Sequence, residues 1–207
     1  MAQPNKFWDR LAKIYSRQPV ADEDAYQKKL QITREYFHPD MEVLEFGCGT
    51  GSTAITHAPF VKHIQAIDFS SKMLKIARSK ADANHVQNIT FKNASIDDFD
   101  APDQTYNIIM GHSILHLLDN RDEVIAKVYK LLKPGGFFIS STICISDGMK
   151  LMKTVLPIGQ FFGILPVLTF FSAEELQNSL TQTGFEIDHH WTPENGKSVF
   201  IVARKPE

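Results

Sequence analysis

The chain has 207 residues, of which 43% are hydrophobic and 22% charged, a composition typical of a globular protein with one well-buried core. Its formal net charge is -2, and no long run of Lys or Arg provides the positive surface needed to bind along a nucleic-acid backbone. Two cysteines are too few for a disulfide framework, and no CxxC pair indicates a metal site. We therefore expect a cytoplasmic protein that binds no nucleic acid.

In chain order, Met1 to Arg17 is polar and amphipathic, unlike a secretory signal. An amphipathic helix is expected after Pro19, with Asp22 as its cap and with residues 38–40 at its end. Short apolar runs then alternate with amphipathic helices, which predicts a parallel sheet with crossover helices on both faces. The expected strands cover residues 42–46, 63–67, 89–92, 106–110 and 136–143, and the expected helices begin near Gly51, Ser70, Ser113 and Asn120. Asn120 stands three residues before Glu123, the spacing of a capping box.

The last third of the chain has a different pattern. Ser172 begins a capping box, and Gly184 is expected to end the helix that follows. Two further strands, 185–191 and 198–203, are joined by a short turn. Such a turn favours an antiparallel pair, so the final strand should run opposite to the rest of the sheet. We find no internal repeat and expect a single domain over residues 1–207.

A glycine-rich turn follows the first expected strand, with Gly47, Gly49 and Gly51 at every second position. Such glycines let the backbone approach a ligand closely, and the following helix aims free N–H groups at it. Asp68 ends the second strand, where a carboxylate can accept the hydroxyl protons of a ribose. A glycine turn also serves plain strand-to-helix packing, but the acid at this distance favours a nucleoside. The dinucleotide fingerprint would place its third glycine at Ser52, so the spacing argues against a nicotinamide cofactor.

Four motifs in this order resemble the class I S-adenosylmethionine (SAM)-dependent methyltransferase family over most of the chain. Residues 45–51 are similar to its first motif and residues 66–74 to its second. Residues 106–116 and 131–136 resemble its fourth strand with the following turn and the lead into its fifth strand. The resemblance implies a Rossmann-like three-layer α/β sandwich, in which a mostly parallel seven-stranded sheet ends in an antiparallel strand. It also implies an enzyme that uses SAM and releases S-adenosylhomocysteine.

The resemblance further assigns residues to the methionine half of SAM. The glycine turn, which includes Cys48, would lie along the methionine, and Glu45 would lie near its amino group. Tyr15, on an N-terminal helix that relatives fold over the cofactor, would reach the methionine carboxylate. Buried thiols usually serve packing, so we expect no reactivity from Cys48.

On the adenosine half, the resemblance implies that Asp68 takes the ribose hydroxyls and that Phe69 and Met73 pack on the adenine. The family commonly has an aspartate that binds the adenine amine after the third strand. Ser95 stands at that position, so the Ile96 backbone is the remaining candidate for the polar contact.

Methyl transfer from a sulfonium needs mainly positioning in a dry pocket. A base helps only when the acceptor must lose a proton, and His112 at the end of the fourth strand is the candidate. The alternative is that His112 lines the wall of the site. His112 and His116 could share one helical face and His189 and His190 are adjacent, but no acidic or Cys ligand accompanies them, so no metal is expected.

Two segments are candidates for covering the acceptor, an N-terminal helical cap over residues 1–38 and a lid-like insertion over about 145–171. The insertion is apolar but is broken by prolines and glycines, so no stable membrane insertion is expected. An apolar cover favours a small hydrophobic or aromatic acceptor, although the same surface would suit a core element or the face of a homodimer. The predicted function is therefore a small-molecule methyltransferase, either monomeric or homodimeric. The alternatives are a nicotinamide-dependent oxidoreductase and a SAM-binding protein without catalytic activity.

Overall fold

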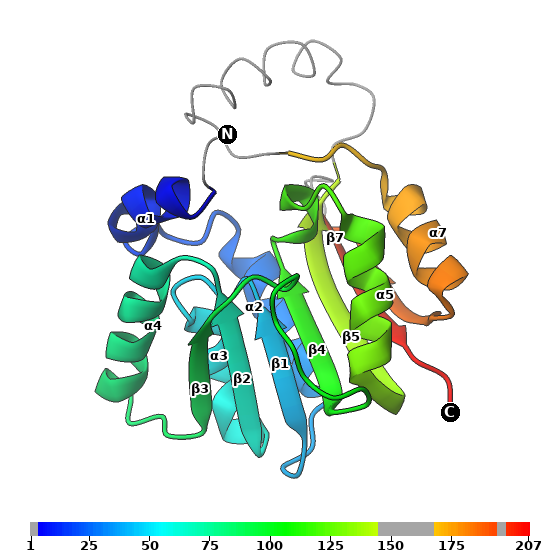
Figure 1. Ribbon diagram of the computed structural model, residues 1–207, viewed down its shortest axis with the longest axis horizontal. Helices are drawn as coiled ribbons and strands as arrows, with labels where there is room; N and C mark the ends of the chain where they lie inside the picture. Colours follow the sequence, from blue (N-terminus) through cyan, green and yellow to red (C-terminus); the bar gives the residue numbers. More distant parts are fainter. Residues whose placement is uncertain (1–3, 145–167, 194–197) are drawn as a thin grey trace.

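The computed structural model describes residues 4–144, 168–193 and 198–207, which form a three-layer α/β sandwich (Figure 1). One seven-stranded sheet has the order β3-β2-β1-β4-β5-β7-β6. Strand β7 is antiparallel to both β5 and β6, and the other pairs are parallel, which confirms the predicted sheet. The strands are β1 Glu42–Phe46, β2 His63–Asp68, β3 Ile89–Asn93, β4 Tyr106–His112, β5 Leu132–Ile143, β6 Glu186–Trp191 and β7 Ser198–Arg204.

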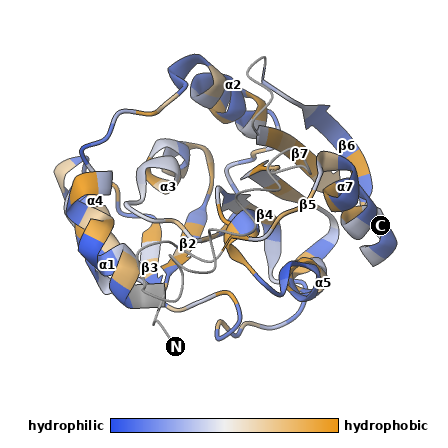
Figure 2. Cartoon of the chain, turned by 90° about the horizontal axis from the view of Figure 1, so that it is seen from above, coloured by the Kyte–Doolittle hydropathy of each residue, from blue (hydrophilic) through white to orange (hydrophobic). Residues whose placement is uncertain are grey.

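Helices cover both faces of the sheet, as Figure 2 shows from above. The α-helices are α1 Pro4–Tyr15, α2 Glu23–Arg34, α3 Ser52–His57, α4 Ser71–Ala83, α5 Arg121–Leu131 and α7 Ala173–Thr183, and the short 3-10 helices are η1 Ala58–Phe60 and η2 Leu115–Leu117. Core residues of α2, α3 and α4 pack on one face of the sheet, and those of α5 and α7 pack on the other. Helix α1 lies against α4. In the described part of the chain, no helix combines the length and the apolar character needed to cross a membrane.

Alternation along the central strands decides which residues face the site. In β1, Leu44 and Phe46 belong to the core under α5, whereas Val43 belongs to the core under α2 and α3. Because successive side chains of a strand point to opposite faces, Glu45 shares the α2 side with Val43. By the same alternation His112 of β4 points to the α2 side, two residues beyond the buried Met110.

Two of the predicted helix boundaries are confirmed in detail. Asp22 caps α2, because its carboxylate accepts a hydrogen bond from Ala25 N at 2.9 Å. Ser172 and Glu175 form the predicted capping box of α7, and Gly184 ends that helix in the left-handed region at φ 109.

Two local predictions are wrong. The expected helix near Ser113 is a single 3-10 turn, and Ser113 itself has φ 54, so His112 and His116 do not share a helical face. The Asn120 side chain does not cap α5, because its amide donates to the Asp97 carboxylate at 2.7 Å. Most of the lid-like insertion, residues 145–167, lies outside the described residues.

Candidate active site

The glycine turn and Asp68 are in direct contact. Strands β1 and β2 are parallel neighbours, so their carboxyl ends meet at one edge of the sheet. Asp68 Oδ2 accepts a hydrogen bond from Gly49 N at 2.8 Å, and Oδ1 accepts one from Ser70 N at 2.8 Å. The Cys48 amide donates to Ile67 O at 3.0 Å, and burial raises the pKa of the Cys48 thiol, which fits a packing role. The two strand ends therefore lie against each other at the edge of the sheet where the sequence predicts the cofactor.

The three glycines of the turn have different surroundings. All have positive φ, which favours glycine. A Cβ on Gly47 would lie 2.9 Å from the Ile114 side chain, and a Cβ on Gly51 would lie 2.8 Å from Ala77 Cβ. A Cβ on Gly49 would meet no heavy atom within 4 Å. Gly47 and Gly51 thus allow close packing, and Gly49 borders the space that a ligand can occupy.

Glu45 is a buried acid with an unused oxygen. Its side chain is 3% exposed, and its Oε2 has no hydrogen-bond partner among the described residues. Burial, followed by the negative charge of Asp68, raises the pKa of Glu45 to about 8, and a backbone hydrogen bond from Ala54 opposes the shift. An unpaired buried acceptor is unfavourable, so this oxygen is suited to a cationic donor such as the ammonium of a bound amino acid.

Asp68 can accept further hydrogen bonds, although two backbone amides already donate to it. An ionised carboxylate offers about four lone-pair positions, of which the Gly49 and Ser70 amides occupy two. Burial raises the pKa of Asp68, and these two amides act in the opposite direction. The carboxylate can therefore accept further hydrogen bonds from a pair of hydroxyls, as a ribose requires.

Hydrogen bonds hold helix α1 against the start of α4, a few residues after Asp68. The Asp9 carboxylate accepts hydrogen bonds from Ser70 Oγ at 2.6 Å and from Lys72 N at 3.1 Å, which ties α1 to the start of α4. The pKa of Tyr15 is raised by burial and by the charge of Asp68. No hydrogen bond joins Tyr15 to Asp68 in the described structure and Tyr15 is 47% exposed, so its contact with the cofactor stays a prediction.

The contacts in the structure do not test the residues expected at the adenine. Phe69 is half-buried directly after β2, and Met73 is buried at 3% exposure in the first turn of α4. The Ser95 hydroxyl donates to the Asp98 carboxylate at 2.7 Å and accepts from Asp98 N at 3.1 Å, so a local turn already uses it. Ile96 is buried in the core. Adenine contacts for these residues stay a prediction.

His112 lies beyond the glycine turn on the α2 side of the sheet. Its Nε2 is buried and has no hydrogen-bond partner among the described residues. Burial and the charge of Lys29 lower its pKa to about 4, so the ring is neutral at pH 7 and can accept a proton. His116 bonds instead to Thr142 Oγ1 through Nδ1 at 3.0 Å. Across the described ranges, no group of three His, Cys, Asp or Glu residues gathers to hold a metal.

Sequence reasoning did not single out two residues of α2 whose electrostatics involve Glu45 and His112. Tyr26 OH lies 3.4 Å from Thr53 Oγ1, and the charge of Glu45 contributes to its raised pKa, although burial is the main cause. Lys29 was also missed, although its spacing from Ala25 and Thr33 places it on the inward side of the helix. A cation at that helical position was the available signal.

His57, at the end of α3, is a fully buried histidine beside the site. Neither ring nitrogen has a hydrogen-bond partner among the described residues, and the ring packs edge-on against Phe37 with centroids 4.9 Å apart. Burial lowers the pKa of His57 to about 3, and the charges of His112 and Arg34 add to the shift.

We expect this histidine to weaken the fold in acid. Between pH 6.5 and about 3 the unfolded chain binds a proton at His57 that the folded chain does not, so stability is complete above pH 6.5 and falls as the pH drops through that window. Urea unfolding at pH 7 and pH 5 should show a smaller loss for His57→Leu than for the wild type, by about 2 kcal/mol, because the linkage reaches about 1.4 kcal/mol per pH unit only below pH 6.5. His190→Leu, at an exposed position of β6, is the control. An unchanged pH slope in His57→Leu would contradict this prediction.

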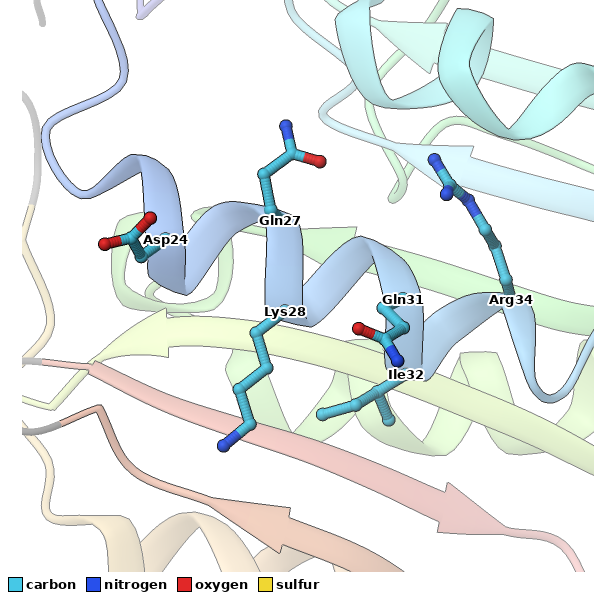
Figure 3. A pocket seen from close by; sticks show the side chains of 6 residues that line it. All are labelled: Asp24, Gln27, Lys28, Gln31, Ile32 and Arg34. Atoms are coloured by element: carbon cyan, nitrogen blue, oxygen red, sulfur yellow. The ribbon is translucent and has the colours of Figure 1, made fainter.

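A separate groove of about 580 Å³ lies along α2 (Figure 3). It is lined by Asp24, Gln27, Lys28, Gln31, Ile32 and Arg34. Gly49, Asp68 and His112 take no part in it, so the cofactor interpretation rests on the strand ends and not on this groove.

Comparison with known proteins shows which family this chain belongs to and which folds it resembles. A model described as a methyltransferase domain matches residues 37–195. The chain is 29% identical to malonyl-[acyl-carrier protein] O-methyltransferase of Priestia megaterium over 80% of its own length and 61% of the relative, so it spans about three fifths of that protein. It is 28% identical to demethylmenaquinone methyltransferase of Leptospira interrogans, over 82% of this chain and 77% of the relative. The crystal structure of the [4+2]-cyclase SpnF superposes with a TM-score of 0.81 at 17% identity, over 99% of this chain and 96% of that one, a likeness of fold alone.

Proposed function

Because this chain belongs to the methyltransferase-domain family, and by its motifs and fold to the class I SAM-dependent methyltransferases, we propose that it methylates a small hydrophobic or aromatic acceptor. The observation that carries the proposal is the contact between Gly49 and Asp68, with the unused oxygen of Glu45 nearby on the same strand as the turn. This arrangement offers an open backbone, an acceptor for hydroxyls and an acceptor for an ammonium.

The residues present fit SAM. When bound, SAM supplies a methyl group on a positively charged sulfur. Glu45 would hold the amino group, Asp68 the ribose hydroxyls, and the backbone at Gly49 the methionine chain. Tyr15 on α1 would cover this side and help to exclude water. His112, neutral at pH 7, would accept a proton from an acceptor that must lose one.

A small acceptor is supported by the names of two relatives. One is named for demethylmenaquinone and the other for malonyl-[acyl-carrier protein], and each alignment covers 80% or more of this chain. The covered share of the malonyl relative is below two thirds, so its activity is not transferred to this chain. The residues around His112 give separate information on the chemical class of the acceptor.

The fold does not by itself determine the reaction, since a [4+2]-cyclase shares it. A SAM-binding protein without methyl transfer is therefore the second candidate. Production of S-adenosylhomocysteine from SAM in the presence of one member of an acceptor panel supports the enzyme. SAM binding without such production from any member of the panel supports the second candidate.

Calorimetry provides the direct test of cofactor binding, and the number of protons released on binding is a second measured quantity. We expect SAM to bind and NADH not to compete. At pH 7 Glu45 is mostly protonated, and an ammonium beside it would lower its pKa, so SAM binding should release about one proton. The heat of binding should therefore change with the ionisation heat of the buffer.

Glu45→Gln isolates this effect, because glutamine keeps the shape of the side chain but carries no titrating proton. The buffer dependence should disappear in this variant, and SAM affinity should fall. A wild-type protein that binds NADH in preference to SAM would refute the proposed function. A buffer dependence that persists in Glu45→Gln would remove Glu45 from the ammonium site.

A further inference from the structure

Lys29 lies on the inward face of α2, where a charged side chain is unfavourable unless a partner compensates the charge. Ala25 and Thr33, one turn before and one turn after it, are both buried. The ammonium of Lys29 has no hydrogen-bond or ion-pair partner among the described residues, and burial lowers its pKa. Asp22 is the acid whose charge acts on it, and the Asp22 carboxylate already caps the helix.

Lys29 faces the same region as His112. Helix α2 packs on the side of the sheet to which His112 points, and the charge of Lys29 acts on the imidazole. The buried Nε2 of His112 has no partner among the described residues. His57 lies close enough to His112 for their charges to interact. Lys29, His112 and His57 therefore lie on the same side of the sheet, and the two imidazoles are neutral at pH 7, so the Lys29 ammonium is the cation among them.

The acids near this region do not neutralise it. Glu45 lies on the same face, but it is protonated when its pKa is about 8, and its remaining oxygen is assigned to the cofactor. Asp68 bonds to the Gly49 and Ser70 amides at the neighbouring strand end. The Lys29 ammonium is thus suited to an anion that the described residues do not supply.

We propose that Lys29 and His112 together bind an anionic oxygen of the methyl acceptor, which narrows the acceptor to phenols, enols and carboxylic acids. This inference rests on the proposed function. Charge-assisted hydrogen bonds are strong where water is excluded, so one oxygen would satisfy the Lys29 ammonium and occupy the His112 nitrogen. For a phenol or an enol, the O–H bond breaks as its proton passes to His112 Nε2, and Lys29 stabilises the oxygen anion that forms. A carboxylic acid arrives already ionised at pH 7, so no base is required, and the neutral imidazole tautomer with its hydrogen on Nε2 would donate to the carboxylate.

The neighbouring lysine provides a matched control. Lys28 lies on the same turn of α2, but its ammonium sits over the Trp191 ring, 4.3 Å from the ring centroid. It also lines the open groove along α2 and has no contact with the glycine turn or with His112 in the described structure. Removing the charge of Lys28 changes the net charge of the helix as much as removing that of Lys29.

The experiment compares benzoate with its neutral analogue benzamide, each titrated by calorimetry into protein saturated with S-adenosylhomocysteine. The wild type should bind benzoate about tenfold or more tightly than benzamide, the value expected for hydrogen bonds to a charged group. Lys29→Gln should lose this preference, and Lys28→Gln should keep it. Lys29→Arg, which restores the charge, should retain most of it. Benzoate should also shift the ring ¹⁵N resonances of His112.

The outcomes separate this inference from the proposed function. Lys29→Gln should bind S-adenosylhomocysteine as the wild type does and unfold at a similar urea concentration. A wild type that binds benzoate and benzamide equally would overturn the inference, as would an equal loss of preference in Lys28→Gln and Lys29→Gln. A wild type that fails to bind S-adenosylhomocysteine would overturn the proposed function itself.

Discussion

Asp68→Ala is expected to weaken SAM binding by about 1 to 3 kcal/mol, or about 5- to 150-fold, as measured by calorimetry. Two losses add together. The ribose hydroxyls lose their charged acceptor, and the Gly49 and Ser70 amides lose the oxygens that they bond at 2.8 Å. Because Gly49 N belongs to the turn itself, the substitution should also loosen the backbone along the methionine.

Two further variants make the test specific. Asp68→Asn keeps one oxygen acceptor and the shape of the side chain, so its loss of affinity should be smaller than that of Asp68→Ala. Asp82→Ala, on the exposed surface of α4, should bind SAM as the wild type does. Unchanged affinity in Asp68→Ala would remove this residue from the site.

The same substitution at two glycines is expected to act mainly on stability at Gly51 and mainly on SAM binding at Gly49. In Gly51→Ala the new Cβ would lie 2.8 Å from Ala77 Cβ and 3.2 Å from the Phe91 ring, at a backbone φ of 74. Left-handed backbone costs about 1–2 kcal/mol and overpacking about 1–3 kcal/mol, so the free energy of unfolding should fall by about 2–5 kcal/mol.

Gly49→Ala meets open space, so its stability cost should be limited to the backbone term of about 1–2 kcal/mol. Its methyl group would project into the space assigned to the methionine, and SAM affinity should fall by about tenfold, the effect of about 1.4 kcal/mol of steric conflict. Urea unfolding and calorimetry on both variants give the comparison. A Gly49→Ala protein that is greatly destabilised yet binds SAM normally would contradict this account of the turn.

The elements that could be predicted from sequence are those with local causes. Glycine spacing, the acid at the second strand end and the capping box at Ser172 each depend on a few adjacent residues, and all three appear in the structure. The antiparallel last strand followed from the short connection before β7, and it is confirmed. The prediction of SAM as the cofactor was based on the glycine turn and Asp68, together with the resemblance of four motifs to the family.

The predictions that failed depended on partners far away in the chain. The helix expected at Ser113 does not form, because Ser113 N bonds to Ser141 O of β5 at 2.6 Å. Asn120 was a reasonable cap by spacing, but Asp97 competes for its side chain. The inward position of Lys29 could be read from the helix alone, but its proximity to His112 could not, since that depends on which side chain of β4 points to the α2 side of the sheet.

A crystal structure with bound S-adenosylhomocysteine is the most direct measurement. We expect both ribose hydroxyls within hydrogen-bond distance of Asp68, the methionine chain against the bare face of Gly49, and the amino group beside Glu45 Oε2. A ligand bound instead along the groove of α2, with Gly49 and Asp68 making no contact to it, would contradict the assignment of a single adenosyl site to these two strand ends.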